Sequence, residues 1–347
     1  MKLFYLFIIV TLLGLFFSSC EEAFTPPIIP GNRPVIVVES YIEAYGEADA
    51  PHHPTNLGII PRPAYAILTN NVPFGSSFFV NNFDTLFVRG ADVKISDGTR
   101  SFPLTEVCLS QLGEIERAEL VESLGLNSAD FSQLGLDFNE TEFCAYIDLF
   151  SNKIEMNQQY TLTIEKDDVL LTATTSTPQL YPIDTIDFRL PPGDSAFFAR
   201  NKIKQMIVKV TPVDTVTSYF RYFTQRNEEA MIKGNAPLSG FRSVIRSDVF
   251  GVGEEFVALP RGQARDSTFN TGSNAFGNYR IKDNYTLKWC TLDEKHYDFW
   301  NSTEFNALNQ GFFSSYTQPQ FNIEGEGGIG IFGGYSVGYY KGEVPKN

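Results

Sequence analysis

The chain has 347 residues, a length that suits one large domain or two ordinary ones. Its 27 Lys and Arg against 41 Asp and Glu give a net charge of −14, which argues against nucleic acid or an anionic membrane surface as a partner. Hydrophobic residues make up 43% and charged residues 20% of the chain, so wholesale disorder is excluded.

The first nineteen residues have the pattern of a lipoprotein signal peptide. Lys2 precedes an almost unbroken apolar run over residues 3–17. Fifteen helical residues cover about 22 Å, which is short of a bilayer core of about 30 Å. The run ends in Phe17, two serines and Cys20, so small residues stand before a cysteine that bacterial lipoprotein processing would acylate. The alternative is an ordinary secretory leader in which Cys20 falls at this place by chance.

Residues 20–33 are expected to form a lipidated tether. Glu21 and Glu22 follow the cysteine directly and resemble the acidic export signal that sends lipoproteins of Bacteroidota to the cell surface. A solvated acidic spacer is the alternative interpretation of this pair. Four prolines within residues 24–34 favour an extended, semi-rigid spacer, and two or more acyl chains on Cys20 would anchor it stably.

Residues 34–178 read as a β-sandwich of immunoglobulin-like size. The 31 Phe and 16 Tyr of the chain, against four Met, favour strands. Short strands separated by turn residues are predicted over residues 35–42, 65–68, 85–88, 92–96, 160–164 and 169–175. A helical insertion is predicted over residues 109–136, because Ile115, Ala118 and Val121 recur among good helix formers.

Residues 179–347 read as a second β-rich domain with one helix. Its strands are predicted over residues 183–190, 205–211, 218–225, 255–259 and 285–290. Thr291 and Glu294 have the spacing of a capping box before a helix that carries Tyr297 and Trp300 on one side. A glycine-rich segment, residues 325–336, closes the chain. We expect its glycines to serve tight turns or close strand packing.

Four segments together resemble a known family. They are VVESYI in the first strand, ADVKISDG followed later by YTLTIEKDDVLLTATTSTP, YPIDTI at the start of the second half, and the closing FNIEGEGGIGIFGGYSV. Over about residues 33–339 the chain resembles the Bacteroidota lipoproteins of the domain of unknown function 4249. The resemblance implies an outer-membrane lipoprotein, typically encoded beside a TonB-dependent receptor and without established enzymatic activity. Only Cys20 carries a role over from the family, and residues 109–136 look like an insertion into its plainer sandwich.

Patterns for catalysis or metal binding are weak in this sequence. Residues 334–338 match G-x-S-x-G around Ser336, but only nine residues and no His follow, so a hydrolase nucleophile is not expected. His52 and His53 stand in a proline-flanked loop and are expected to be solvated, and His296 to be exposed or partly packed. We expect no metal site, no cofactor and no enzymatic activity.

Three cysteines remain once Cys20 is set aside. Cys108 and Cys144 bracket the helical insertion, and the cell envelope permits disulfides. A disulfide between them would close the intervening loop and stabilise the fold by roughly 3–4 kcal/mol. The alternative is a pair of buried thiols. Cys290, beside Trp289 in a predicted strand, is then left over and expected to be buried.

Five residues match the short Asp-Ser/Thr pattern that resembles the O-glycosylation acceptor of exported Bacteroidota proteins. They are Thr85, Thr185, Ser195, Thr215 and Ser267. Because the pattern is only three residues long, chance matches are expected among them.

Three functions stay open on the sequence alone. The first is a non-catalytic, surface-exposed outer-membrane lipoprotein, held by its lipid anchor, that acts as accessory to a TonB-dependent transporter in substrate capture or handling. The second is a stand-alone surface module that binds glycan or peptide or acts in adhesion. The third is an envelope enzyme with an unrecognised site, which would need paired carboxylates in a deep pocket.

Overall fold

The computed structural model describes residues 35–71, 85–123, 142–193, 195–210, 217–227, 229, 231–234, 243–250, 257–260, 277–308 and 318–346. The contacts of the chain divide it after Arg33, and all described residues belong to the unit 34–347. The expected signal peptide and tether, with Cys20, Glu21 and Glu22, therefore lie outside the described residues.

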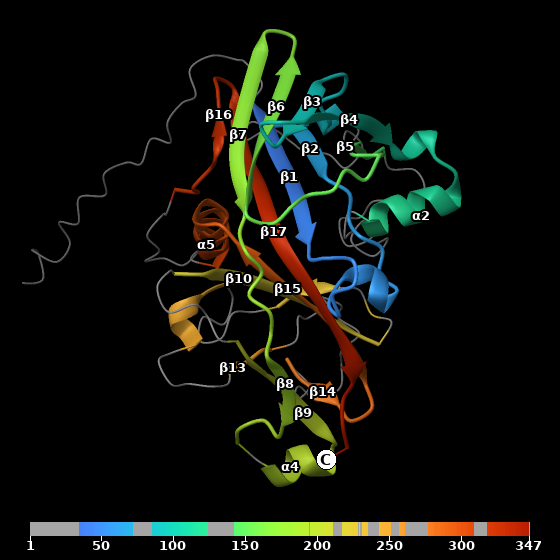
Figure 1. Ribbon diagram of the computed structural model, residues 1–347, viewed down its shortest axis with the longest axis vertical. Coiled ribbons are helices and arrows are strands. Elements are labelled where there is room, and N and C mark those ends of the chain that lie inside the picture. Colours follow the sequence, from blue (N-terminus) through green and yellow to red (C-terminus); the bar gives the residue numbers. More distant parts are fainter. Residues whose placement is uncertain are drawn as a thin grey trace, which may run out of the picture. The chain divides into compact units, whose positions relative to one another are not determined.

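Strands dominate the first half of the unit (Figure 1). They are β1 (Ile36–Tyr45), β2 (Tyr65–Asn70), β3 (Asp92–Ser96), β4 (Ser101–Cys108), β5 (Cys144–Ile147), β6 (Gln158–Lys166) and β7 (Val169–Thr177). The helical elements are η1 (Pro54–Leu57), η3 (Leu109–Gln111) and α2 (Glu114–Ser123).

The second half adds ten strands and further helices among the described residues. The strands are β8 (Thr185–Arg189), β9 (Ile203–Lys209), β10 (Tyr219–Arg226), β11 (Ile232–Lys233), β12 (Val244–Arg246), β13 (Val257–Ala258), β14 (Tyr279–Arg280), β15 (Asn284–Leu292), β16 (Ile323–Glu324) and β17 (Gly328–Glu343). The helices are α4 (Ser195–Arg200), η4 (Ser247–Phe250) and α5 (Glu294–Leu308).

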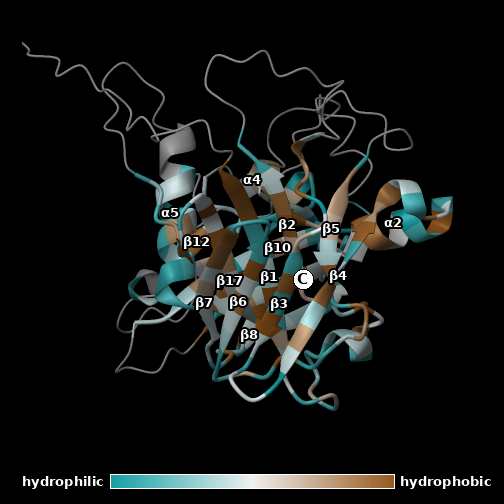
Figure 2. Ribbon diagram, turned by 90° about the horizontal axis from the view of Figure 1, so that it is seen from above, coloured by the Kyte–Doolittle hydropathy of each residue, from teal (hydrophilic) through white to brown (hydrophobic). Residues whose placement is uncertain are grey.

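Within the described part of the chain, thirteen strands share one mixed sheet in the order β11-β10-β15-β17-β1-β2-β5-β4-β3-β6-β7-β16, with β12 beside β10. A smaller sheet joins β13, β9 and β14, with β8 also paired to β9. Figure 2 shows hydrophobic segments concentrated in the strands of the large sheet and hydrophilic ones on α5 and the turns. The mainly β, sandwich-like fold predicted from the sequence is confirmed.

The parallel pairing of β1 with β17 joins the two halves of the chain. Ile36 is the register partner of Gly328, and the pairing continues to Tyr45 and Val337. Strands from both sides of residue 178 therefore hydrogen-bond within one sheet, and the expected domain boundary at that residue does not divide the sheet. A Cβ on Gly330 would lie 1.9 Å from the Val38 carbonyl oxygen, so only glycine allows this approach.

The large sheet curls until β7 returns to β17. The Asn322 side chain links the two strands: its Nδ2 donates to the carbonyl oxygens of Thr174 (3.1 Å) and Phe332 (2.8 Å). The backbone amide of Gly334 donates to Thr175 Oγ1 at 2.8 Å. The two layers enclose a hydrophobic core that includes Val38 and residues of β3, β6 and β7. The glycine-rich segment is therefore a closely packed central strand, as its composition suggested.

The helices differ in detail from the sequence expectation. The insertion forms η3 and α2, and its remaining residues, 124–136, lie outside the described residues. On α2, Val121 is buried whereas Ile115 is 75% exposed, because a three-residue spacing drifts around the helix. The cap of α5 is Asp293, whose Oδ1 accepts the His296 amide at 2.8 Å, rather than the expected Thr291, which lies buried in β15.

None of the helices in the described part of the chain has the length and apolar character needed to cross a membrane.

Candidate functional site

A set of charged and aromatic side chains is buried on one face of the large sheet, across β1, β17, β15 and β10. Because side chains alternate along a strand, residues two apart share a face. We call this set the charged face. Its members are Tyr41 and Glu43 on β1, Tyr335 and Tyr339 on β17, Lys288 and Cys290 on β15, and Arg221 on β10. Helix α5 packs against β10, β12 and β17 beside it.

Glu43 and Lys288 form a buried ion pair at the centre of the charged face. The ammonium hydrogen-bonds to Glu43 Oε1, although the two residues are 245 positions apart in the chain. The Tyr45 hydroxyl donates to Glu43 Oε2 at 2.7 Å and accepts the Arg62 amide at 2.8 Å. Burial opposes the charged carboxylate, but Lys288 and Arg62 outweigh it and hold the pKa of Glu43 below its ordinary value. The negative charge of Glu43 is therefore fixed by two cations.

Arg221 forms a second network where α5 covers the sheet. Its Nε donates to Ser243 Oγ at 2.9 Å, and NH1 donates to the Tyr335 hydroxyl at 2.8 Å. NH2 lies 3.8 Å from Glu304 Oε1, and the guanidinium carbon lies 3.8 Å from the centre of the Trp300 ring. Both Trp300 and Glu304 belong to α5, so this cation attaches the helix to β10 and β17.

Glu304 is the carboxylate that balances Arg221. It accepts the Ser243 amide at 2.6 Å and the Ser243 hydroxyl at 2.7 Å, and it pairs with Lys233 Nζ at 2.7 Å. Burial opposes its charge, but Arg221 and Lys233 lower the pKa of Glu304 overall. The second network thus joins α5 to β10, to β11 and to the residue before β12 through one ionised carboxylate.

His296 is fully buried, which corrects the expectation of an exposed or partly packed residue. Its Nδ1 lies 3.2 Å from the Gly334 carbonyl oxygen and donates to it, while Nε2 accepts the Trp300 indole N–H at 3.1 Å. A Cβ on Gly333 would lie 2.5 Å from the imidazole, so glycine makes room for the ring. Burial lowers the pKa of His296 to about 4, and the ring is neutral at pH 7.

The nucleophile candidates of the sequence are held in structural positions. The Ser336 hydroxyl donates to the Pro178 carbonyl oxygen from the middle of β17, so the strand–turn–helix context of a nucleophile elbow is not met. Cys290 is a free, buried cysteine as expected, and burial raises the pKa of its thiol to about 12. The charged face is thus a buried set of groups whose ion pairs and hydrogen bonds can fix the strands against one another.

The other residues singled out from the sequence are not members of the charged face. Thr85, Thr185 and Ser195 are exposed, whereas Thr215 and Ser267 lie outside the described residues. His52 and His53 are partly buried. The His53 Nδ1 is 2.7 Å from Thr55 Oγ1, and the His52 ring stacks on Tyr340.

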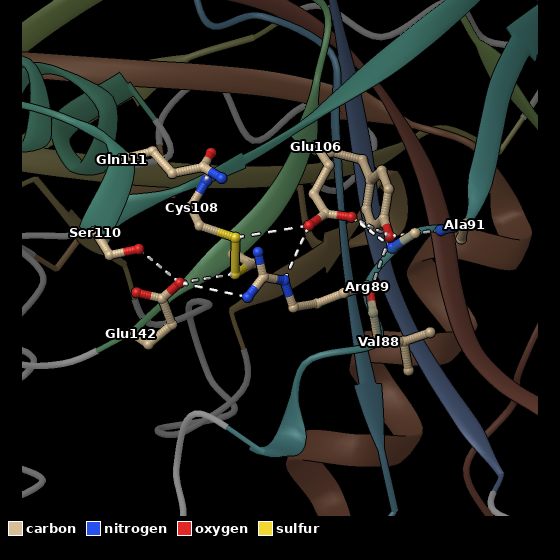
Figure 3. The surroundings of a disulfide bond; sticks show 11 residues. Val88, Arg89, Ala91, Glu106, Cys108, Ser110, Gln111 and Glu142 are labelled. Atoms are coloured by element: carbon tan, nitrogen blue, oxygen red, sulfur yellow. Dashed lines mark hydrogen bonds and ion pairs between the residues drawn. A yellow bond between two sulfur atoms is a disulfide. The ribbon is translucent and has the colours of Figure 1, made fainter.

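Cys108 and Cys144 form a disulfide between neighbouring strands (Figure 3). They are register partners of β4 and β5, with Cα atoms 4.1 Å apart. This is the pairing proposed from the sequence. Glu106, Glu142 and Arg89 lie around the two sulfurs.

Sequence reasoning missed the charged face. Glu43 and Lys288 lie in strands that read as ordinary amphipathic segments, where a charged residue normally points to solvent. The sequence did contain a signal: Tyr41, Glu43 and Tyr45 are spaced two apart, which puts the carboxylate on the same side of the strand as two aromatic rings.

Together, the curled sheet and the charged face define a mainly β protein whose two halves share one sheet and one buried charge network. The chain belongs to the family described as Domain of unknown function (DUF4249), whose model matches residues 61–341. The match extends from before β2 into β17, so it includes strands from both halves of the chain. In the same comparisons no curated protein and no solved structure matched the chain.

Proposed function

We propose that this protein is a non-catalytic lipoprotein of the outer membrane, exposed at the cell surface, that acts as accessory to a TonB-dependent transporter in substrate capture or handling. The observation that carries the proposal is Cys20, which follows an apolar run and two serines at the position of a lipidation site. The family resemblance adds the transporter partner.

The length of chain between Cys20 and β1 suits a tethered accessory. Residues 20–35 precede Ile36, the first residue of β1. Sixteen residues can span at most about 55 Å, which lets an anchored unit reach over a neighbouring membrane protein. Glu21 and Glu22 provide the acidic pair of the proposed surface-export signal.

The buried carboxylates of the charged face and of the adjoining α5 network support a structural role over a catalytic one. Glu43 and Glu304 each accept hydrogen bonds and lie beside cations, so both are held as ionised, paired groups. General acid–base chemistry needs a group whose pKa lies near the working pH. These carboxylates have lowered pKa values instead, which favours a structural use of their charge.

The first experiment is purification of the tagged protein from its native outer membrane in mild detergent, followed by mass spectrometry of the N-terminal peptide and of bound proteins. We expect an acylated Cys20 and a stoichiometric TonB-dependent transporter. The Cys20→Ala variant should lose membrane association and the partner, whereas the Cys290→Ala variant serves as a matched cysteine control that keeps both. Recovery of acylated protein alone would overturn the accessory role and favour a free-standing glycan- or peptide-binding module.

Surface export is tested separately with the Glu21→Ala/Glu22→Ala variant. We expect it to stay in the membrane fraction but to become resistant to protease added to intact cells. A control with Glu47→Ala and Asp49→Ala, which removes two exposed acidic side chains elsewhere, should remain sensitive. Equal protease sensitivity of both variants would contradict the role of the acidic pair.

A further inference from the structure

The Cys108–Cys144 disulfide lies between two carboxylates (Figure 3). Glu106 precedes Cys108 by two residues on β4, and Glu142 precedes Cys144 by two residues. Glu106 and Cys108 share a face of β4, since residues two apart lie on the same side of a strand, and Glu142 stands just before β5. Each carboxylate lies beside the sulfur that follows it. Glu106 Oε1 is 3.8 Å from Cys108 Sγ, and Glu142 Oε1 is 3.7 Å from Cys144 Sγ.

One cation serves both carboxylates. Arg89 Nε is 3.0 Å from Glu106 Oε1, and its NH1 is 3.8 Å from Glu142 Oε1. The side chain of Arg89 is 51% exposed, so it can swing into solvent at small cost. Ser110 Oγ donates to Glu142 Oε1 at 2.8 Å and fixes the direction of that carboxylate.

We propose that reduction of this disulfide creates a binding site for a zinc-like divalent cation, formed by the sulfurs of Cys108 and Cys144 and the carboxylate of Glu142. One donor atom from each residue already lies within 4.8 Å of the other two. Two thiolates and a carboxylate are a donor set that selects zinc or a similar borderline-soft metal over calcium or magnesium. The proposal is independent of the lipid anchor and of any transporter.

The charge balance favours a cation only in the reduced state. In the disulfide the sulfurs carry no charge, and Arg89 offsets part of the charge of the two carboxylates. Two thiolates would add two negative charges beside Glu142, and a divalent cation would neutralise them. Ser110 would then act as the outer hydrogen-bond partner that orients a metal-bound carboxylate.

The chemistry balances with a dithiol as reductant. The dithiol gives two electrons and two protons, becomes a disulfide itself, and leaves two thiols on Cys108 and Cys144. Binding of the metal then forms two sulfur–metal bonds and releases two protons to water. A small-molecule disulfide reverses the sequence: it accepts the two electrons, takes up two protons and becomes a dithiol, while the Cys108–Cys144 bond re-forms and the metal is released.

The test is zinc binding to the full chain with Cys20→Ala as background, measured by competition with a chromophoric chelator under anaerobic conditions. Protein reduced with a phosphine is compared with oxidised protein. We expect one zinc per reduced chain, and an affinity at least ~100-fold above that of the oxidised chain. Cobalt in place of zinc should give the absorption of thiolate–cobalt charge transfer.

Two variants separate this site from adventitious binding. Glu142→Gln should weaken zinc binding to the reduced chain by about 10–100-fold, whereas Glu165→Gln, an exposed carboxylate on β6, should leave it unchanged. The Cys108→Ser/Cys144→Ser chain keeps Cys290 and should not bind. Equal zinc affinity of the reduced and oxidised chains would overturn the proposal. Equal affinity of the reduced Glu142→Gln variant and the reduced parent would also overturn it. The second result covers the case in which reduction unfolds the chain, because exposed thiols would then bind zinc without Glu142.

Discussion

Replacing Lys288 by Met removes the ammonium that pairs with Glu43 while keeping a side chain of similar length. The side chain of Lys288 is 1% exposed and that of Glu43 4%, so water cannot simply replace the lost cation. Arg62 NH1 remains 3.7 Å from Glu43 Oε1 and offsets only part of the loss. Because removing one partner of a buried ion pair costs about 3–5 kcal/mol, we expect a loss of that size in unfolding free energy.

The matched control is Lys94→Met, the same substitution in an exposed ion pair. Lys94 pairs with Asp92 on β3, and their side chains are 43% and 51% exposed. Solvent screens such a pair, so its loss should change the free energy of unfolding by less than about 1 kcal/mol. Any general effect of replacing a strand lysine by methionine appears in both variants and cancels in the comparison.

Urea unfolding followed by tryptophan fluorescence and far-UV circular dichroism measures both losses. The Glu43→Gln and Glu43→Gln/Lys288→Met chains complete a double-mutant cycle. The double variant should lose less than the sum of the single variants, because neither Glu43 nor Lys288 is left charged without the other. Arg62 loses its ion pair with Glu43 in both Glu43→Gln chains, so that loss cancels in the cycle. Equal losses in Lys288→Met and Lys94→Met would refute the idea that the buried pair fixes β1 against β15.

Three further measurements test other contacts of the same unit. Burial lowers the pKa of His296 to about 4, so between pH 7.5 and pH 5 the unfolded chain takes up a proton that the folded chain does not, and the parent loses about 2 kcal/mol of unfolding free energy. His296→Gln should remove this part of the pH dependence. An unchanged slope of unfolding free energy against pH would contradict the burial of the neutral ring. Gly333→Ala should cost about 1–3 kcal/mol because its Cβ would lie 2.5 Å from the imidazole, whereas Gly46→Ala, with ordinary contacts, should be nearly neutral in the same urea assay. Reducing the bond between Cys108 and Cys144, which are 36 positions apart, should lower the free energy of unfolding by about 4 kcal/mol and shift the urea midpoint accordingly. An unshifted midpoint would show that the bond does not stabilise the fold.

Local pattern was enough to predict most of the strands. The alternation over residues 160–164 and 169–175 predicted the two strands that the structure pairs in a hairpin as β6 and β7. A hairpin needs only neighbouring residues, so its signal is contained in one short window of sequence. The disulfide between Cys108 and Cys144 could also be predicted from the sequence, because so few cysteines leave few possible pairings.

The remaining features depend on contacts between distant segments. Nothing in residues 36–45 indicates that β17, almost three hundred positions later, pairs with them in parallel. The burial of His296 likewise depends on two glycines of β17, later in the chain. Gly333 leaves space for the imidazole ring, and the Gly334 carbonyl oxygen accepts its hydrogen bond. A single histidine near a helix start is more often exposed, and only the packing of α5 on β17 reverses that expectation.

The length of β17 explains why the boundary expected at residue 178 does not divide the sheet. Its first ten residues, Gly328 to Val337, pair with β1, and residues from Tyr335 onward pair with β15, so one strand of 16 residues belongs to both halves. The charged face follows the same arrangement: Glu43 comes from β1 and Lys288 from β15, on either side of β17. Neither half of the chain contains both charges, and the buried pair therefore forms only when the two halves fold as one unit.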